Sequence, residues 1–360
     1  MQVFVTGATG FIGGRLARAL LAAGHRVRAL VRDPAAAQPL AQAGVELHQG
    51  DIRDRGTVRE AMRGAERVVH AAAWYRIGSD DAAQAHDINV VGTRNVLEIM
   101  RELAVPRGVY TSSIAVYGDT QGRTVDEATP ITGPWNSTYE RTKALAHTEV
   151  ALPMMAEGLP LVTLLPGVVY GPGDRSPIRD SLVQLLQKRL PVAPRNTTYC
   201  WAHVDDTAAV HVRALEQGRT GECYIVAGPV CELLRVYELA AAQAGVPAPR
   251  LHPSGKTLRT LARASDALAR FVPHLPAAYR GESLRSVAET TSIASSAKAQ
   301  RELAWQPRGS SWACARPSST SSRSCAAEPR RRGRDQSDSC AAASKMPCAM
   351  RLVLACARAR

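Results

Sequence analysis

The glycine-rich segment TGATGFIG at 6–13 constrains the fold more strongly than any other part of the chain. An apolar run at 3–5 precedes it, and a segment with helical periodicity follows it at 15–21. A strand, a glycine turn and a helix in this order predict a phosphate cradle, because glycines let the backbone approach a pyrophosphate and the helix N-terminus presents free N–H groups. The alternative is a tight turn without a ligand. The residues expected to contact the phosphates are Gly7, Thr9, Gly10, Phe11, Ile12 and Gly13.

Short apolar segments alternate with helical periodicity through the first half of the chain. Strands are expected at 26–33, 45–48, 67–70 and 108–113, and a long helix at 87–103. This alternation predicts an α/β fold with a Rossmann-type, doubly wound parallel sheet. The alternation decays beyond Pro166, where a smaller C-terminal substrate lobe is expected. The expected division is a nucleotide-binding domain at 1–165, a mainly substrate-binding lobe at 166–308 that returns to the first domain, and a tail at 309–360.

Charge and hydropathy argue against two classes of partner. The net charge is +13, but the tail carries ten Lys or Arg and three Asp or Glu, so the main body has only a mild basic excess. No expected helix in the main body has a basic stripe with interleaved aromatics, so no nucleic-acid partner is expected. No apolar run approaches a membrane span and no signal peptide is expected, so we expect a cytoplasmic protein with no membrane contact.

The end of the second strand bears on which dinucleotide is bound. An acid at this position accepts hydrogen bonds from the adenosine ribose, whereas an arginine suits a 2′-phosphate. The apolar strand ends at Val31 and Arg32 follows, which favours NADP. NAD stays open, because Asp33 could be the ribose acid in a shifted register. Asp51, with its neighbour Ile52, follows the third strand, and its carboxylate could accept the adenine amino group.

Small and aromatic side chains follow the fourth strand. Ligands in such sheets bind outside the carboxyl ends of the strands. Small residues at that edge would let a cofactor lie close, and an aromatic loop beside them could form a substrate wall or a local packing cluster. The small residues are Ala71, Ala72 and Ala73, and the aromatic residues are Trp74 and Tyr75.

A tyrosine and a lysine four residues apart, Tyr139 and Lys143, predict chemistry as well as nucleotide binding. On a helix they face the same side. A neighbouring ammonium is expected to lower the pKa of a phenol from about 10, which would make Tyr139 a usable acid or base. The same ammonium could hold the nicotinamide ribose hydroxyls. A serine hydroxyl at the end of the preceding strand, in the pair Ser112-Ser113, could hydrogen-bond the substrate oxygen.

Two histidines in the second half raise the question of a metal site. His203 and His211 lie eight residues apart with aspartates between them. No third ligand is arranged with them, so ordinary hydrogen-bonded histidines are expected and no metal.

Together these motifs resemble the extended short-chain dehydrogenase/reductase family, in its epimerase/dehydratase-like branch. The resemblance covers residues 1 to about 307, and 27–34 look most like the NADPH-dependent dihydroflavonol-reductase-like subgroup. The motifs are GDI at 50–52, HAAA at 70–73, NVVGTRNVL at 89–97, TSSIAVYGD at 111–119, YERTK at 139–143, PGVVYGPGD at 166–174 and HVDD at 203–206, together with the glycine segment.

The resemblance implies a role for each matching residue. Tyr139 looks like the catalytic acid/base, Lys143 its partner, and Ser113 the hydroxyl that polarises the substrate oxygen. Asn89 resembles a partly structural helix asparagine beside the cofactor. The segment expected to set the nicotinamide face contains Pro166, Val168 and Val169. Leu165 replaces the arginine usual before that proline, and Ser113-Ile114-Ala115 replaces the Thr-Asp-Glu triplet of 4,6-dehydratases, so a dehydratase is not expected.

Three functions remain open at this stage. The first is an NAD(P)-dependent reductase or dehydrogenase acting on a small-molecule carbonyl or carbinol, with Tyr139 transferring the proton. The second is a nucleotide-sugar epimerase with a tightly bound cofactor. The third is a nucleotide-binding protein without catalysis, since fold alone does not imply function. A homodimer is also left open.

Residues 309–360 have a different composition from the rest of the chain. Ser, Arg, Ala and Cys dominate there, and apolar periodicity is absent. The sequence predicts either a frameshifted translation of a GC-rich gene or a disordered basic tail.

Overall fold

The computed structural model of the protein describes residues 1–79, 81–269, 271–272 and 275–308, so the expected tail at 309–360 lies outside the described residues. Seven parallel strands form the main sheet, in the order β3-β2-β1-β4-β5-β6-β9. The predicted Rossmann-type α/β fold is therefore confirmed. The strands are β1 (Gln2–Thr6), β2 (Arg26–Val31), β3 (Glu46–Gln49), β4 (Arg67–His70), β5 (Gly108–Thr111), β6 (Leu161–Pro166) and β9 (Cys223–Val226).

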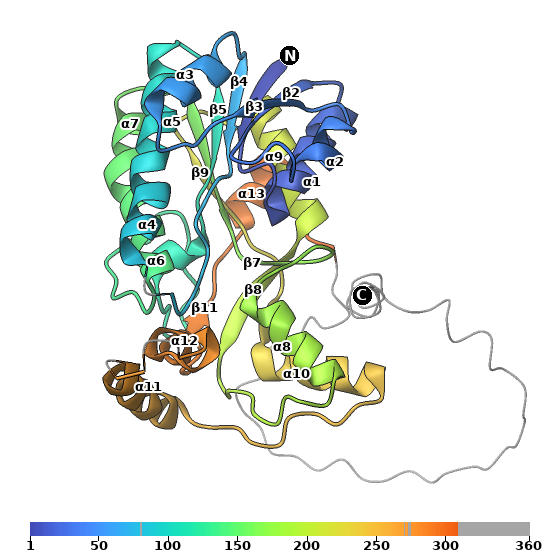
Figure 1. The fold of residues 1–360 in the computed structure, drawn as a ribbon, viewed down its shortest axis with the longest axis vertical. Helices are drawn as coiled ribbons and strands as arrows, with labels where there is room; N and C mark the ends of the chain where they lie inside the picture. The colour runs from blue at the N-terminus through green and yellow to red at the C-terminus, as the bar shows by residue number, and fades with distance from the viewer. Residues whose placement is uncertain (80, 270, 273–274, 309–360) are drawn as a thin grey trace, which may run out of the picture.

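Helices cover both faces of this sheet (Figure 1). Alternate residues of each strand face opposite layers, so Val3 and Val5 belong to one apolar core and Phe4 to the other. One layer contains α1 (Phe11–Ala22), α2 (Gln38–Ala41), α9 (Val204–Gln217) and α13 (Ala297–Leu303). The other contains α3 (Arg55–Met62), α4 (Ala82–His86), α5 (Gly92–Glu102), α6 (Thr138–Leu145) and α7 (Leu152–Ala156).

Two π-helical turns join helices within the second layer. Asp87–Val91 links α4 to α5, and Ala146–Ala151 links α6 to α7. The helix expected at 87–103 therefore begins earlier, at Ala82, and contains a π turn. Such turns are frequently found at functional sites, and the first of these two contains Asn89.

A smaller lobe lies beyond the carboxyl ends of the main strands (Figure 1). Its central strand β8 pairs antiparallel with β10 and parallel with β7 and β11. The strands are β7 (Val168–Tyr170), β8 (Thr198–His203), β10 (Val230–Glu232) and β11 (Thr291–Ser292). The helices are α8 (Pro177–Leu186), α10 (Leu233–Ala244), α11 (Gly255–Ala269) and α12 (Gly281–Ser286), with a short 3₁₀ turn at Ala277–Tyr279. A second 3₁₀ turn, at Ile114–Tyr117, follows β5 in the larger lobe.

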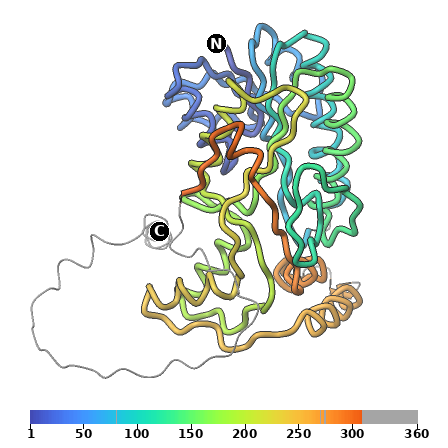
Figure 2. The backbone as a smooth tube through the Cα atoms, turned by 180° about the vertical axis from the view of Figure 1, so that it is seen from behind, coloured from blue at the N-terminus to red at the C-terminus, as the bar shows by residue number. Residues whose placement is uncertain are grey.

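The chain passes between the two lobes more than once. β9 pairs with β6 at the edge of the main sheet. The strands that precede and follow β9 in the sequence, β8 and β10, belong to the smaller lobe. Later the chain leaves the smaller lobe again and forms α13 against the main sheet (Figure 2). The indole N–H of Trp305 then donates to the carbonyl of Ala227, 3.0 Å away, which anchors this last segment. None of the described helices is long and apolar enough to cross a membrane.

The glycine turn supplies a test of the fold. A Cβ at Gly13 would lie 2.1 Å from the carbonyl oxygen of Gly7, a backbone atom that cannot move without opening the turn. We expect Gly13→Ala to abolish dinucleotide binding, measured by titration calorimetry. Gly14→Ala is the matched control, because its Cβ would meet the carbonyl of Ala8 at 3.3 Å, where a small shift suffices. Equal nucleotide affinity in the two variants would contradict the expectation.

Candidate active site

The glycine turn forms a cradle against the end of β4. Gly7 has a φ of +76°, and a Cβ there would lie 2.5 Å from the backbone nitrogen of Ala72. The amide of Gly10 donates to the carbonyl of Gly7 at 2.9 Å, and α1 begins immediately afterwards. Gly10 is the N-cap of α1 and supplies no side-chain cap, so the first N–H groups of the helix remain available to an anion.

The other residues of the turn surround this cradle. Thr9 and Gly10 are exposed, whereas Phe11 and Ile12 are half-buried. At the neighbouring strand end, Ala71 and Ala72 are half-buried and Ala73 is exposed. The residues present therefore fit a dinucleotide pyrophosphate.

Two arginines and an aspartate mark the expected adenosine end. Asp51 accepts hydrogen bonds from the Arg53 guanidinium at 2.9 and 3.0 Å. These bonds, with a smaller contribution from the charge of Arg32, hold the pKa of Asp51 below its usual value. Arg32 is exposed, while Asp33 accepts from the amides of residues 35 and 36 and so caps its own turn.

Ile52, expected beside the adenine, has a different environment from Asp51. Its side chain is buried in the apolar core. Its carbonyl accepts a hydrogen bond from the Asn95 side chain at 3.0 Å. The backbone N–H of Ile52 is therefore the group best suited to reach a cofactor.

Trp74 and Tyr75 lie in opposite environments. Trp74 is only 6% exposed, and its indole N–H donates to Gln84 at 3.1 Å. The burial of Trp74 and its bond to α4 favour the packing alternative, and its place in a substrate wall stays a prediction. Tyr75 is 45% exposed, and its ring lies edge-on to Tyr139 with centroids 4.7 Å apart.

Asn89 fastens the loop after β4 to the helix that carries Tyr139. Its side-chain oxygen accepts from the amide of Trp74 at 2.7 Å. Its amide group donates to the Trp74 carbonyl at 3.1 Å and to the Thr142 hydroxyl at 2.9 Å. Because all of these groups are buried, Asn89 fixes the distance between the strand end and α6.

Ser113 and Tyr139 meet at the carboxyl edge of β5. Ser113 follows the strand, and its hydroxyl accepts from the amide of Ala115 at 3.1 Å. The same hydroxyl lies near enough to the phenol of Tyr139, in the first turn of α6, to favour its ionised form. The structure thus brings together the three groups expected to face the substrate, Ser113, Tyr139 and Tyr75.

Lys143 lies one helical turn beyond Tyr139 and is 2% exposed. Its ammonium donates to the Tyr110 hydroxyl at 3.0 Å and to the Thr111 carbonyl at 2.8 Å. Within the described part of the chain these are its two recorded acceptors, so the third N–H is available to a ligand. Burial lowers the pKa of Lys143 to about 7.

The pKa of Tyr139 departs from the expectation. Burial raises it to about 12, against the opposing effect of the hydrogen bond from Ser113. The expected lowering by the Lys143 ammonium is wrong for the free protein. The physical reason is that burial penalises both charged forms, so the phenol stays protonated and the lysine is only partly charged near neutral pH.

A buried chain of polar groups extends from Lys143 to the glycine turn. The Tyr110 ring stacks on the ring of His70, with centroids 5.5 Å apart. Thr93 Oγ1 lies 2.9 Å from His70 Nε2, and His70 Nδ1 lies 2.7 Å from Thr6 Oγ1. Thr6 directly precedes Gly7, so this stacked pair and its hydrogen bonds connect the catalytic edge to the phosphate cradle.

Donor and acceptor directions in this network define the state of His70. The Thr93 hydroxyl donates to the Asn89 carbonyl at 2.6 Å, so its oxygen must accept from His70 Nε2–H. Thr6 Oγ1 accepts from the Ala72 amide and therefore donates to Nδ1. Burial, and secondarily the charge of Lys143, lowers the pKa of His70 to about 3, which agrees with a neutral imidazole.

Sequence reasoning missed Tyr110, Thr93, His70 and Thr6 as site residues. His70 stood in the HAAA motif without a role. The available signal was that polar residues occupy positions which the strand and helix periods place inside the protein.

The segment expected to set the nicotinamide face lies between the lobes. Pro166 is buried and ends β6, whereas Val168 and Val169 are half-buried on β7. β7 pairs with β8, placing Val168 opposite Trp201 and Val169 opposite Ala202.

Histidines 203 and 211 have structural partners. His203 is the N-cap of α9 and accepts from the amide of Asp205 at 3.2 Å. His211 Nδ1 donates to the Thr207 carbonyl at 2.7 Å, so Nε2 accepts from the Thr111 hydroxyl at 2.9 Å. Within the described ranges, no group of three or more His, Cys, Asp or Glu residues could hold a metal ion.

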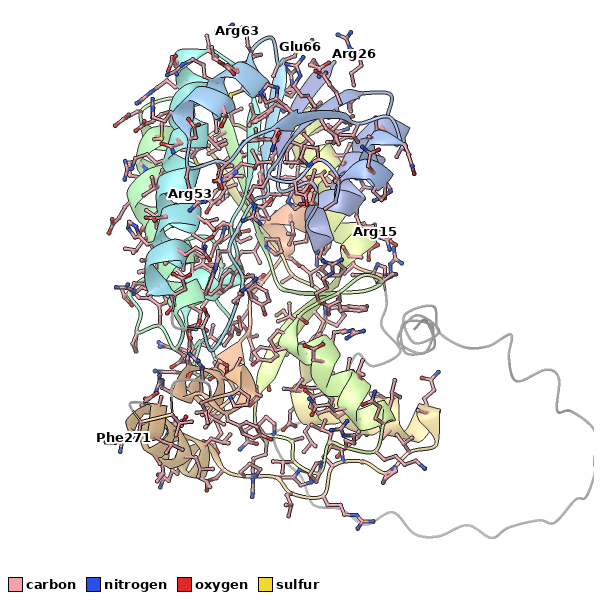
Figure 3. The ribbon with its side chains drawn as sticks, viewed as in Figure 1. Arg15, Arg26, Arg53, Arg63, Glu66 and Phe271 are labelled. Carbon is pink, nitrogen blue, oxygen red and sulfur yellow. The ribbon has the colours of Figure 1, made fainter. Side chains whose placement is uncertain are left out.

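A cavity of about 460 Å³ lies elsewhere, at the amino ends of the strands. Gln2, Arg26 and Arg63 are among its lining residues. Figure 3 shows Arg26 and Arg63 at the end of the sheet opposite the smaller lobe. This cavity is therefore separate from the catalytic edge.

A family model supports this reading of the geometry. The model described as the NAD dependent epimerase/dehydratase family matches residues 3–227. The chain belongs to this family. The matched range includes the glycine turn, Ser113, Tyr139, Lys143 and β9, and the resemblance seen in the sequence is confirmed.

Curated relatives include several oxidoreductases. Sterol demethylase protein B of Methylococcus capsulatus is 32% identical over 311 residues, covering 85% of this chain and 94% of that protein. A putative dihydroflavonol 4-reductase of Synechocystis is 33% identical over 256 residues, covering 69% and 74%. A 4-hydroxy-2-methyl-3-oxo-4-farnesyl-3,4-dihydroquinoline-1-oxide ketoreductase of Stigmatella aurantiaca is 33% identical over 232 residues, covering 63% and 68%.

Solved structures show the same fold. The crystal structure of gox2253 superposes with a TM-score of 0.72 at 32% identity, covering 85% of this chain and 93% of that one. A UDP-glucose 4-epimerase of Thermus thermophilus, in complex with NAD, superposes with a TM-score of 0.68 at 24% identity, covering 87% and 96%. The second likeness concerns the fold alone.

The buried lysine predicts a pH dependence of stability. Below pH about 7 the folded protein holds a desolvated ammonium, whereas the unfolded chain keeps its lysine charged up to about pH 10.5. Between these values the unfolded state binds more protons, so the free energy of unfolding rises with pH, by at most about 1.4 kcal/mol per unit. We expect Lys143→Met to lose this rise in urea titrations from pH 7 to 9.5. Parallel pH profiles for the wild type and the variant would contradict it.

Proposed function

We propose that the protein is an NAD(P)-dependent oxidoreductase that transfers a hydride between nicotinamide and a carbonyl or carbinol substrate. The observation that carries the proposal is that Ser113, Tyr139 and the buried Lys143 converge at the edge that the glycine cradle also faces. Reductases among the relatives support it.

The protein's own groups would act on the substrate oxygen. A bound nicotinamide supplies or accepts the hydride at the substrate carbon. In the reducing direction, the protonated phenol of Tyr139 gives its proton to the carbonyl oxygen while Ser113 donates a hydrogen bond to that oxygen. The raised pKa of Tyr139 keeps the phenol protonated at neutral pH, which suits an acid. In the oxidising direction, the phenolate of Tyr139 accepts the proton of the substrate hydroxyl.

We infer an apolar substrate from two observations. The smaller lobe has half-buried apolar side chains packed on its core, among them Val168, Ile178 and Leu182, and Val168 lies on β7, close after the end of β6. The names of two relatives refer to a sterol and to a farnesyl quinoline. A ketone or secondary alcohol on a largely apolar skeleton would fit both observations.

A purified preparation would test the reaction. We expect stoichiometric NADPH oxidation, followed at 340 nm as the absorbance typical of reduced nicotinamide, with a panel of apolar ketones and of flavonoid and steroid carbonyls. Tyr139→Phe should lower kcat by at least about a hundredfold, the scale of general acid catalysis. Full activity in that variant would refute the proposed mechanism.

The alternatives predict other results in the same preparation. Interconversion of UDP-sugars without net NADPH oxidation would indicate a nucleotide-sugar epimerase, the second activity that the family model admits. Nucleotide binding with neither reaction would indicate a protein that binds the dinucleotide without catalysis.

We also infer a preference for NADP. Arg32 is exposed at the end of β2, and Asp33 is engaged in its own turn. Hydrogen bonds to charged groups contribute about 1.5–3 kcal/mol, so Arg32→Ser should weaken NADPH binding by about 10- to 100-fold and leave NADH binding unchanged. Arg26→Ser is the matched control, since Arg26 is exposed at the other end of the same strand (Figure 3). An equal loss for NADH would exclude a contact with the 2′-phosphate.

A further inference from the structure

Glu282, in the first turn of α12 in the smaller lobe, contacts the larger lobe at two points. One carboxylate oxygen accepts from the amide of Thr138 at 2.6 Å. The other accepts from the amide of Gly78 at 2.9 Å. A single carboxylate thus bridges the start of α6 and the loop that carries Tyr75.

The two lobes are in close backbone contact here. Gly78 has a φ of +75° and is buried. A Cβ at this position would lie 2.4 Å from the hydroxyl of Ser283 and 2.6 Å from the carbonyl of Ala277. The loop can approach Glu282 this closely only because residue 78 lacks a side chain.

Thr138 is the first residue of α6, and Tyr139 is the second. The first amides of a helix have no partner within the helix. Ser137 caps the amide of Glu140 at 3.2 Å, and the Glu140 carboxylate accepts from the amide of Asn136 at 2.7 Å. The amide of Thr138 is satisfied from outside, by Glu282.

Two carboxylates therefore meet at this helix N-terminus. Burial, and to a smaller extent the charges of Glu282 and Asp119, raises the pKa of Glu140 to about 7. A second acidic group beside a buried one is unfavourable in itself. The two charge-assisted hydrogen bonds of Glu282 and the positive end of the helix dipole offset that repulsion.

We propose that Glu282 is a positioning residue, which holds the helix turn of Tyr139 and the loop of Tyr75 in the geometry that the reaction needs. This role rests on the proposed function. It makes the acid/base group dependent on the smaller lobe, because the first turn of α6 would fray without its external acceptor. A displacement of about 1 Å at a reacting group can cost a hundredfold in rate.

Three variants of the full chain would test the role. Glu282→Ala removes both acceptors, Glu282→Gln keeps one carbonyl oxygen, and Glu289→Ala is the matched control. Glu289 belongs to the same lobe, and its carboxylate lies against Gly255, the first residue of α11, as Glu282 lies at the start of α6. Circular dichroism would verify that each variant is folded.

Two readouts separate positioning from general stability. We expect kcat for carbonyl reduction to fall by about 10- to 100-fold in Glu282→Ala, with the KM for NADPH unchanged. Glu282→Gln should be intermediate and Glu289→Ala unaffected. In hydrogen exchange, the amides of Thr138 and Gly78 should exchange faster in Glu282→Ala, while Glu289→Ala should affect only the start of α11.

The outcomes distinguish the role of Glu282 from the proposed reaction. Unchanged exchange at both amides in Glu282→Ala would overturn the proposal whether or not the protein reduces a carbonyl. Faster exchange with unchanged kcat would also overturn it, because the contact would then not position Tyr139. If the wild type shows no reductase activity, the proposed function fails, and faster exchange at 138–141 would still support a lobe-dependent helix start.

Discussion

The buried ammonium of Lys143 is the group near the catalytic edge whose hydrogen-bond acceptors the fold has to supply. An unpaired charge inside a protein is strongly unfavourable, so its N–H groups need acceptors held at hydrogen-bond distance. β5 supplies two of them, the Tyr110 hydroxyl and the Thr111 carbonyl. The ring of Tyr110 stacks on His70 of β4, which hydrogen-bonds Thr93 of α5 and Thr6 of β1. Four elements of the main fold are thereby aligned on one lysine.

The sheet order makes this alignment achievable. Strands β1, β4 and β5 are neighbours and parallel, so their carboxyl ends reach the same edge. The order changes direction between β1 and β4, which is where ligands bind in such folds. The glycine cradle uses the turn after β1, and the reactive hydroxyls use the turn after β5 and the start of α6. Cofactor and acid/base groups therefore face one another without a long loop.

The glycine turn and the common helix face of Tyr139 and Lys143 could be predicted from the sequence, because each is encoded within a few residues. The polar groups could not be connected from the sequence, because three of their hydrogen bonds join residues that are 64, 23 and 33 positions apart. Trp74 and Tyr75 are adjacent in sequence but differ in exposure, and only the position of α4 explains that difference. The pKa of Tyr139 likewise depends on burial, which cannot be deduced from the spacing of residues in the sequence. The helical periodicity at 87–103 also did not predict the π turn that contains Asn89.

The position of β9 affects how the larger lobe can form during synthesis. Residues 1–166 contain six of the seven main strands, yet they leave the edge of β6 open until Cys223–Val226 is added. An open edge strand can pair with other chains, so a nascent chain released early would present β6 as a surface for aggregation. Leu303 and Trp305 complete the core on one face still later. The larger lobe is therefore finished only after almost all of the smaller lobe has been made, and the two are a single unit of folding despite their separate sheets.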